Sequence, residues 1–281
     1  MKLAVFIPAY NEASTIGGVI SAIPGKINGI SQIRIFVVDD GSTDGTEEVA
    51  GSALASRESL LARAAGAPRE DRSGHPTFEV APTSKVGCVS IKPNRGLANA
   101  FRTGLATARN SGADLIVHLD ADGQYDPAEI PKLLAPIMNN AADMVTGDRQ
   151  ISKCGFLGPA RQYGNLLGSW FLRAFTGVKV RDASCGFRAY SRAAAESLEV
   201  HSTHTYTHET LIEAKYKGLR VAEVPISFRH RGISASDSAT PASSPCAKKP
   251  TSRLTSNLFK HIFKSLSAIF AARARYAKSS K

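Results

Sequence analysis

The chain has 281 residues, of which 43% are hydrophobic and 21% are charged, a composition that excludes disordered and collagen-like proteins. This length allows one large domain or two small ones with a substantial core. No run of about 18 apolar residues occurs, so we expect no transmembrane helix. The four cysteines form no C-x-x-C pair, which argues against a zinc site or disulfide framework and favours a reducing cytoplasm.

The net charge of +11 is concentrated near the C-terminus. Residues 229–281 contain eleven Lys or Arg and one acidic residue, Asp237, so they carry a net charge of +10. The rest of the chain is therefore close to neutral. A basic segment of this kind predicts a polyanionic partner, either nucleic acid or an anionic membrane surface.

Apolar runs that suit buried parallel strands alternate with segments of helical periodicity through the first two-thirds of the chain. Strands are predicted at residues 2–8, 33–38, 86–91, 113–119 and 142–147, and helices at residues 13–23, after Ser42, at residues 97–108 and after Pro127. Thr43 or Asp44 can cap the second of these helices, because acidic residues follow in its first turn. The alternation favours an α/β fold with a mostly parallel sheet and helices on both faces. The apolar N-terminus is expected to be the first strand rather than a signal peptide.

Two segments interrupt this alternation. Residues 51–84 are rich in Ala, Ser, Arg and Gly, which predicts an extended helix end followed by an exposed insertion. Residues 232–252 are rich in Ser, Ala and Pro, which is typical of a flexible linker. We therefore expect a folded domain at residues 1–231, then the linker, then a basic tail at residues 253–281.

Polar clusters follow three of the predicted strands, where ligands of an open parallel sheet bind. The clusters are Pro8-Ala9-Tyr10-Asn11-Glu12, Asp39-Asp40-Gly41-Ser42 and Asp120-Ala121-Asp122-Gly123. A single acidic cluster after a strand is most simply a turn or a helix cap. Three that converge repel one another unless a cation joins them. Asp120 and Asp122 are therefore candidate ligands of Mg²⁺ or Mn²⁺, which bind carboxylate and phosphate oxygens together and would stabilise a departing diphosphate.

Other motifs for nucleotide or metal chemistry are absent from the sequence. Neither G-x-x-x-x-G-K-[ST] nor G-x-G-x-x-G after the first strand occurs, which argues against a P-loop and against a nicotinamide or flavin site. His201, His204 and His208 are spaced by three and four residues, but no H-E-x-x-H occurs. We expect a loop that leads into a helix at residues 206–217, rather than a zinc site.

Seven blocks in chain order resemble the family 2 glycosyltransferases of GT-A fold. They are IPAYNE, VVDDGSTDGT, NRGLANAFRTGLATA, DADGQYDP, GDR, DASCGFRAYSR and YTHETLIEAKYKGLRVAEVPI. Within the family, the chain is most similar to the polyprenyl-phosphate sugar transferases, the dolichol-phosphate mannose synthase group. The resemblance covers about residues 1–231 and resumes near Arg253. It implies a Rossmann-like GT-A domain that transfers a sugar from a UDP- or GDP-linked donor with inversion at the sugar carbon.

The resemblance assigns roles by position. Nucleotide contacts fall on Pro8, Tyr10, Glu12, Asp39, Asp40, Arg95, Gly96 and Asp120, and metal contacts fall on Asp120 and Asp122. Asp182, Arg188 and Glu209 belong to blocks that frame the acceptor site, and Asp182 or Glu209 is the candidate base. Arg229, Arg231 and Arg253 are candidates for the contact with the diphosphate or the acceptor phosphate. The alternative interpretation is structural: Gly96 opens a helix, and Arg188 pairs with a structural carboxylate.

The chemistry of the acceptor stays open at this point. A polyprenyl phosphate has a second pKa of about 6 and is already anionic at neutral pH. Positioning and charge neutralisation would then supply most of the catalysis. A saccharide hydroxyl would instead need a carboxylate to take its proton. More distant alternatives are an inactive transferase scaffold that binds membranes or nucleic acid, against which the intact clusters argue, and a nucleotidyltransferase.

Residues 257–272 have apolar residues at helical spacing with lysines, serines and a histidine between them, which predicts an amphipathic helix with a basic face. Such a helix either packs on the core or lies in a membrane interface, where each basic residue contributes about 1 kcal/mol near an anionic leaflet. A lipid-linked acceptor favours the interface. Nucleic acid is the weaker alternative, because no nucleic-acid-binding motif occurs. We expect a cytoplasmic enzyme, peripheral at the inner face of the membrane.

Overall fold

The computed structural model describes residues 1–64, 87–153, 159–202 and 206–229. The predicted linker and basic tail, with Arg231 and Arg253, lie outside the described residues, as does most of the predicted insertion. None of the helices in the described part of the chain combines the length and apolar content that a bilayer span requires.

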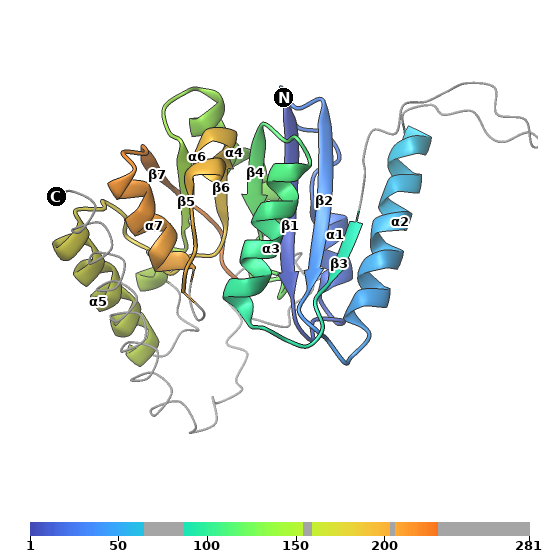
Figure 1. Ribbon diagram of the computed structural model, residues 1–281, viewed down its shortest axis with the longest axis horizontal. Coiled ribbons are helices and arrows are strands. Elements are labelled where there is room, and N and C mark those ends of the chain that lie inside the picture. Colours follow the sequence, from blue (N-terminus) through green and yellow to red (C-terminus); the bar gives the residue numbers. More distant parts are fainter. Residues whose placement is uncertain (65–86, 154–158, 203–205, 230–281) are drawn as a thin grey trace, which may run out of the picture.

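A seven-stranded sheet runs through the molecule in the order β3-β2-β1-β4-β6-β5-β7 (Figure 1). The strands are β1 (Lys2–Ala9), β2 (Gln32–Asp39), β3 (Gly87–Ser90), β4 (Leu115–His118), β5 (Met144–Asp148), β6 (Arg188–Ser191) and β7 (Val221–Pro225). Every neighbouring pair is parallel except the two that involve β6, which is antiparallel to β4 and β5. The predicted mostly parallel sheet and its first five strands are confirmed.

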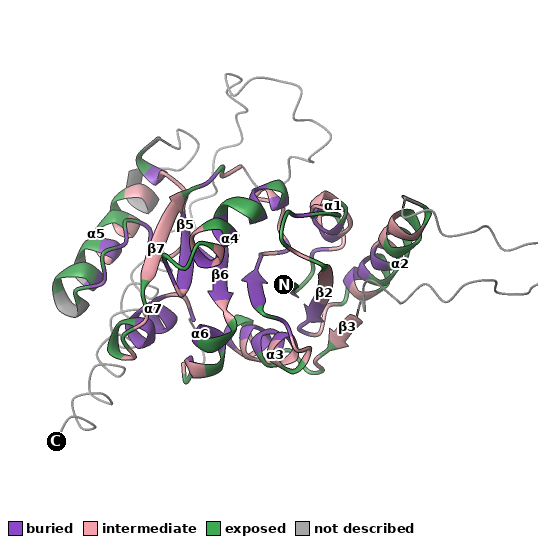
Figure 2. Cartoon of the chain, turned by 90° about the horizontal axis from the view of Figure 1, so that it is seen from above, coloured by how far each residue is buried: buried purple, intermediate pink, exposed green. Residues whose placement is uncertain are grey.

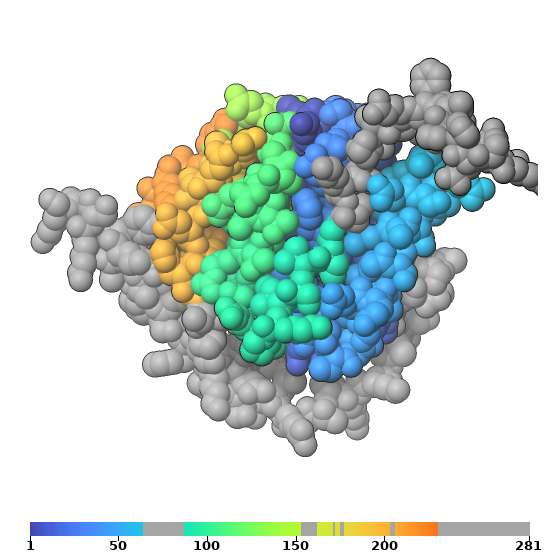
Figure 3. Space-filling view, turned by 45° about the vertical axis from the view of Figure 1, so that its right-hand side comes forward, coloured from blue at the N-terminus to red at the C-terminus, as the bar shows by residue number. Residues whose placement is uncertain are grey.

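Helices cover both faces of the sheet (Figure 2). They are α1 (Ile16–Ala22), α2 (Thr46–Ala64), α3 (Leu97–Asn110), α4 (Ile130–Met138), α5 (Pro159–Thr176), α6 (Arg192–Ser197) and α7 (Thr207–Tyr216), with short 3-10 turns η1 (Pro127–Glu129) and η2 (Ile151–Lys153). In the space-filling view, the surface of α3 lies between the edge formed by α2 and the α6–α7 segment (Figure 3).

Alternate residues of β1 build two separate cores. Leu3, Val5 and Ile7 pack with α1, α2 and α4 on one face, whereas Ala4 and Phe6 pack with α3 and α7 on the other. All five side chains are fully buried. This is why the strand is a continuous apolar run rather than an alternating one, as expected for a parallel sheet with helices on both faces.

Helix starts agree with the predicted ones in three places, including α3 at Leu97, and differ in one. Asp44 accepts the backbone N–H of Thr46 at 3.1 Å where α2 begins, and η1 begins at Pro127 as predicted. The first helix is predicted from residue 13, but α1 begins at Ile16. A turn precedes it, because the carbonyl of Glu12 accepts the N–H groups of both Thr15 and Ile16.

The parallel register brings the ends of several strands to one edge of the sheet. Ala9 at the end of β1 lies opposite Asp39 at the end of β2, and Phe6 lies opposite His118 at the end of β4. The loops that follow these strands therefore meet at this carboxyl edge, which is where the polar clusters were predicted to converge.

Candidate functional site

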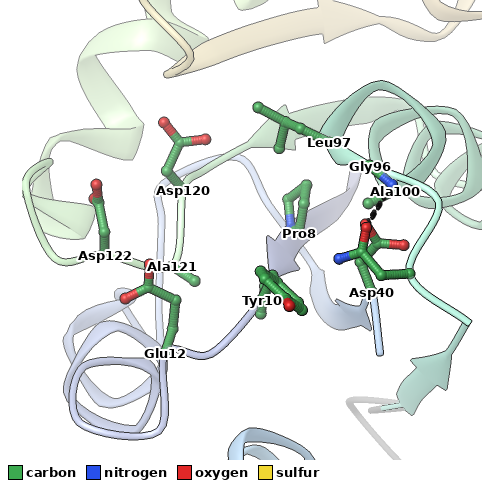
Figure 4. Close-up of a pocket in the computed structure, with 12 residues that line it drawn as sticks. Pro8, Tyr10, Glu12, Asp40, Gly96, Leu97, Ala100, Asp120, Ala121 and Asp122 are labelled. Atoms are coloured by element: carbon green, nitrogen blue, oxygen red, sulfur yellow. Dashed lines mark hydrogen bonds between the residues drawn. The ribbon is translucent and has the colours of Figure 1, made fainter. Parts of the chain in front are cut away.

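A pocket of about 400 Å³ opens at the carboxyl edge of β1, β2 and β4 (Figure 4). Most residues predicted as nucleotide or metal contacts line it, namely Pro8, Tyr10, Glu12, Asp40, Gly96, Asp120 and Asp122. Figure 4 shows the carboxylates of Glu12, Asp120 and Asp122 on one side of the pocket and Asp40 on the other, with Tyr10 between them. The fold thus gathers in one cavity residues that lie more than a hundred positions apart in the sequence.

The Asp40 side of the pocket is built by backbone hydrogen bonds. The Asp40 carboxylate accepts the N–H groups of Arg95 at 2.9 Å and Gly96 at 2.7 Å, which ties the loop before α3 to the end of β2. Gly96 has φ +88°, a left-handed conformation that favours glycine. Asp39 is fully buried beneath the pocket, where it accepts the N–H and the hydroxyl of Ser42 and shapes the turn.

The first loop presents one aromatic and one acidic side chain. Tyr10 is 50% exposed and lines the pocket, and an aromatic ring suits stacking against a planar group. Glu12 is almost buried and accepts the hydroxyl of Thr15 at 3.1 Å. Its backbone N–H donates to Thr46 Oγ1 at 2.8 Å, which fixes the loop against the start of α2.

The Asp120 side of the pocket depends on a strand distant in sequence. A Cβ atom at Gly186 would lie 2.6 Å from an Asp120 carboxylate oxygen and 2.9 Å from the Tyr206 hydroxyl, so only glycine leaves room there. Asp122 accepts the N–H of Gln124 at 3.1 Å. The segment that leads into β6 therefore packs directly against a residue of the pocket.

The donor atoms available in the pocket fit a hard divalent cation. Among the described residues, no group of three or more acidic, histidine or cysteine side chains could hold a metal by itself. Asp120 and Asp122 offer two carboxylates at most. Mg²⁺ and Mn²⁺ sites of this kind complete their coordination with water and substrate phosphates.

His118 belongs to this site although the sequence did not point to it. The ring is fully buried, its Nδ1 contacts the carbonyl of Gly186, and its Nε2 lies 3.5 Å from Asp120 Oδ1. Burial lowers the pKa of His118 to about 3, so the ring is neutral at neutral pH. The only signal available was a lone histidine in an apolar strand, two residues before Asp120.

Asp182 lies in a different place from the pocket residues. Its carboxylate accepts Arg149 Nε at 2.6 Å and Arg149 Nη2 at 2.8 Å and is almost fully buried. The backbone N–H of Asp182 donates to Glu223 of β7 at 2.9 Å. Asp182 lines a second cavity of about 1010 Å³ beside β5 and β7, together with Leu166 of α5. The sequence did not single out Arg149 or Glu223.

Arg188 and Glu209 are both buried and do not line the first pocket. Arg188 is fully buried in β6 and donates to the carbonyls of Thr207 at 2.7 Å and Ala183 at 2.9 Å. Glu209 is also buried and accepts the backbone N–H groups of His201 at 3.1 Å and Ser202 at 2.8 Å. The structure does not bring either side chain to the first pocket.

The remaining predicted residues are partly described. The backbone N–H of Arg229 donates to the carbonyl of Gln124 at 2.8 Å, and its guanidinium contacts Asp126 at 2.6 Å, so it lies against the loop that follows Asp122. The helix predicted at residues 206–217 is confirmed by α7, and His204 lies outside the described residues. His201 is half exposed and His208 is buried, so the two described histidines of that trio lie in different surroundings.

Comparisons with known proteins agree with the resemblance. The profile of Glycosyl transferase family 2 matches residues 4–60 and 70–199. A UDP-N-acetylglucosamine–dolichyl-phosphate N-acetylglucosaminyltransferase of Methanococcus voltae is 31% identical over 228 residues, which is 79% of this chain and 83% of the relative. An undecaprenyl-phosphate mannosyltransferase of Micrococcus luteus is 27% identical over 246 residues, which is 84% of this chain and 87% of the relative.

Solved structures agree on the fold. Glucosyl-3-phosphoglycerate synthase from Mycobacterium tuberculosis, in complex with Mn²⁺, UDP-glucose and phosphoglyceric acid, superposes with a TM-score of 0.61 at 20% identity. The superposition covers 95% of this chain and 79% of that one. The family match spans more than half of the chain, and the relatives align over most of their length. The chain therefore belongs to glycosyltransferase family 2, with a GT-A fold, and is related to the dolichyl- and polyprenyl-phosphate sugar transferases.

Proposed function

We propose that this glycosyltransferase moves a sugar from a nucleoside diphosphate sugar to a polyprenyl phosphate, with inversion at the sugar carbon. The observation that carries the proposal is the pocket at the carboxyl edge, which combines an exposed aromatic face at Tyr10 with carboxylates at Asp40, Asp120 and Asp122. An aromatic face suits a nucleobase, and Asp40 and Glu12 suit polar contacts to base or ribose. The donor bound by the M. tuberculosis synthase supports the same donor class.

Mg²⁺ or Mn²⁺ is the proposed cofactor, held by Asp120 and Asp122. A cation bound there would neutralise charge on the departing diphosphate. The residues of this chain contribute position: Gly186 and His118 limit where the Asp120 carboxylate can lie, and the Gln124 N–H holds Asp122. Arg229, next to the same loop, is the described candidate for a phosphate contact.

The engaged carboxylates support an acceptor that needs no general base. Asp182 is paired with Arg149, and Glu209 accepts two backbone N–H groups, so both acids take part in contacts that hold the fold. A phosphate whose second pKa is about 6 arrives already ionised at neutral pH and needs no proton acceptor. The names of the M. voltae and M. luteus relatives support the same acceptor class.

The proposed location is the inner face of the cytoplasmic membrane. The +10 charge of residues 229–281 and the amphipathic pattern at residues 257–272 support attachment to an anionic leaflet. A polyprenyl phosphate would be met there by lateral diffusion.

Thermal stabilisation by UDP and GDP, each with and without Mn²⁺, tests the donor site. A nucleotide at a hundred times its dissociation constant stabilises the fold by about 2.7 kcal/mol. We expect one nucleotide to stabilise the protein in a Mn²⁺-dependent manner, and Asp122→Ala to abolish the effect. Asp114→Ala, an aspartate near the opposite end of β4, is the matched control and should keep it. No stabilisation by either nucleotide would contradict the proposal.

The same protein then tests the acceptor. We expect radiolabelled sugar to move from the identified nucleotide to a polyprenyl phosphate in detergent micelles. Transfer to free saccharides but to no prenyl phosphate would overturn the acceptor assignment and leave the donor site intact.

A further inference from the structure

Helix α5 exposes an apolar stripe to solvent. Tyr163, Leu166, Leu167 and Trp170 recur at intervals of three, one and three residues, so they share one helix face. They are 72%, 45%, 58% and 56% exposed, respectively. The opposite face holds the helix to the protein, since Ser169 and Leu172 are buried and the Ser169 hydroxyl accepts the N–H of Ala183 at 3.1 Å. Exposed apolar patches of this kind usually mark an interaction surface.

Positive charge surrounds this stripe. Helix α5 contains no acidic residue. Arg173 of α5, with Lys179 and Arg181 shortly after the helix, lines the second cavity, to which Leu166 also contributes. Three acidic side chains also line that cavity, and each is engaged within the protein: Asp182 pairs with Arg149, whereas Glu223 and Asp148 accept backbone N–H groups. The apolar stripe therefore runs into a cavity with three cations around it.

We propose that the exposed face of α5 docks on an anionic lipid bilayer. The inference rests on the proposed function, because the acceptor phosphate would lie in the same bilayer. Tyrosine and tryptophan prefer the interface between headgroups and acyl chains, and leucines enter the apolar layer beneath it. Arg173, Lys179 and Arg181 would then face the negatively charged headgroups.

Charge complementarity separates this occupant from two others. A second copy of α5 would place arginine against arginine across a symmetric interface. The amphipathic segment at residues 257–272 belongs to a region with a net charge of +10, so it would meet the same cations. An anionic bilayer is the partner whose charge is opposite. It would also bring the second cavity, which borders α5 through Asn165 and Leu166, against the lipid surface.

Trp170 makes the inference directly measurable, since it is the one tryptophan of the chain. The full-length protein is mixed with vesicles of phosphatidylcholine and phosphatidylglycerol in equal parts, and tryptophan emission is recorded. We expect a shift to shorter wavelength and quenching when the acyl chains carry bromine. Vesicles that leave the emission unchanged overturn the inference, whether or not the protein sediments with them through another segment.

Leu166→Ser/Leu167→Ser tests the stripe without touching the nucleotide pocket. We expect loss of the emission shift and lower transfer to polyprenyl phosphate in vesicles, with unchanged nucleotide-dependent stabilisation. Leu60→Ser is the matched control, because Leu60 is 63% exposed on α2, at the opposite end of the sheet (Figure 1). If Leu60→Ser loses the emission shift and the transfer activity to the same extent as the double variant, the inference is overturned.

A short, water-soluble prenyl phosphate separates this inference from the proposed function. We expect the double variant to glycosylate it as the wild type does, since no membrane is involved. Transfer to prenyl phosphates without any Trp170 response overturns the docking alone. A Trp170 response without transfer to any prenyl phosphate overturns the acceptor class and leaves the docking face standing.

Discussion

At the scale of single residues, Gly186 has more influence on the site than its lack of a side chain implies. An alanine there would place its Cβ 2.6 Å from the Asp120 carboxylate, and that carboxylate would have to move. A misplacement of this size costs on the order of 100-fold in rate. We therefore expect Gly186→Ala to lower kcat/KM by about that factor. Steady-state kinetics over a range of Mn²⁺ concentrations checks this.

The control for Gly186→Ala is Gly18→Ala in α1, where an added Cβ meets nothing within 4 Å. It should leave kcat/KM unchanged. Full activity of Gly186→Ala would mean that the Asp120 side of the pocket tolerates displacement.

Glu209 gives a second test at this scale. If it only holds the loop at His201 and Ser202, Glu209→Gln should cost about 1–3 kcal/mol of unfolding free energy, because charged hydrogen bonds are weakened. The kcat and its pH profile, measured on the folded fraction, should not change. Urea unfolding measures the change in unfolding free energy, and initial rates measure kcat and its pH profile. A loss of about 100-fold in kcat with an intact fold would restore Glu209 as a general base.

His208 predicts how stability depends on pH. Burial and the positive charge of Arg188 lower its pKa to about 4 from the ordinary 6.5. Between these two pKa values, His208 binds a proton in the unfolded chain but not in the folded one. The free energy of unfolding therefore falls as the pH drops below about 6.5. At about pH 5, protonation of His208 in the unfolded chain lowers the free energy of unfolding by about 2 kcal/mol.

His208→Gln removes the titrating group. We expect the variant to lose about 2 kcal/mol less than the wild type between about pH 8 and pH 5, as measured by urea unfolding at both values. The comparison at the higher pH is the internal control for packing changes. Equal losses in both proteins would show that His208 is solvated or paired in solution.

At the scale of elements, Gly104 lets α3 lie close to β1. An added Cβ would come within 2.3 Å of the Phe6 ring, which is fully buried and packed against Phe101. Alanine favours a helix over glycine by about 1 kcal/mol, but overpacking a rigid core costs about 1–3 kcal/mol. We expect the clash to prevail and Gly104→Ala to lower the melting temperature.

Gly51→Ala in α2 is the matched test of that balance. Apart from its chain neighbours and the backbone of the same helix, no atom lies within 4 Å of its added Cβ, so only helix propensity changes. We expect stabilisation of about 0.5–1 kcal/mol. Calorimetry should therefore show a higher melting temperature for Gly51→Ala and a lower one for Gly104→Ala. A stabilised Gly104→Ala would show that α3 can move away from β1.

The elements that the sequence predicts are those whose burial pattern is simple. The first five strands are short apolar runs between turn residues, and the polar residues at their ends are enough to predict most of the pocket. Neither β6 nor β7 is predicted as a strand. β6 has only four residues and contains the buried Arg188, so it lacks an apolar run. β7 lies at the edge of the sheet and is half buried, and it carries Glu223.

The unpredicted parts of the site share one physical cause. Contacts such as those of His118 and Gly186 depend on β6 lying beside β4, and single-chain periodicity carries no information about that pairing. The pair of Arg149 and Asp182 depends in the same way on the order of β5 and β6. Helix α5 is not predicted either, because its apolar stripe faces solvent while small residues such as Ser169 face the core.

At the scale of the whole molecule, charge is divided along the chain. Residues 1–228 are close to neutral, and residues 229–281 carry +10. If this basic region helps to hold the enzyme on a bilayer, deleting residues 257–281 should abolish transfer to polyprenyl phosphate in vesicles. Stabilisation by nucleotide and Mn²⁺ should persist. Parallel transfer assays and thermal melts check this, and full transfer by the truncated protein would assign membrane attachment to α5 alone.

The antiparallel strand β6 makes one register decisive for how the two cavities lie relative to each other. The first pocket is built on β1, β2 and β4, and the second cavity borders β5 and β7. Within the sheet, the pairing of β4 with β6 joins these halves. It runs over four residue pairs, from Leu115 with Ser191 to His118 with Arg188. A slip of two residues would keep every side chain on its face and move Gly186 along the strand by about 7 Å. Within the sheet, one short antiparallel strand pair therefore sets how the two cavities lie relative to each other, and a shift in its register would displace one cavity's lining against the other's.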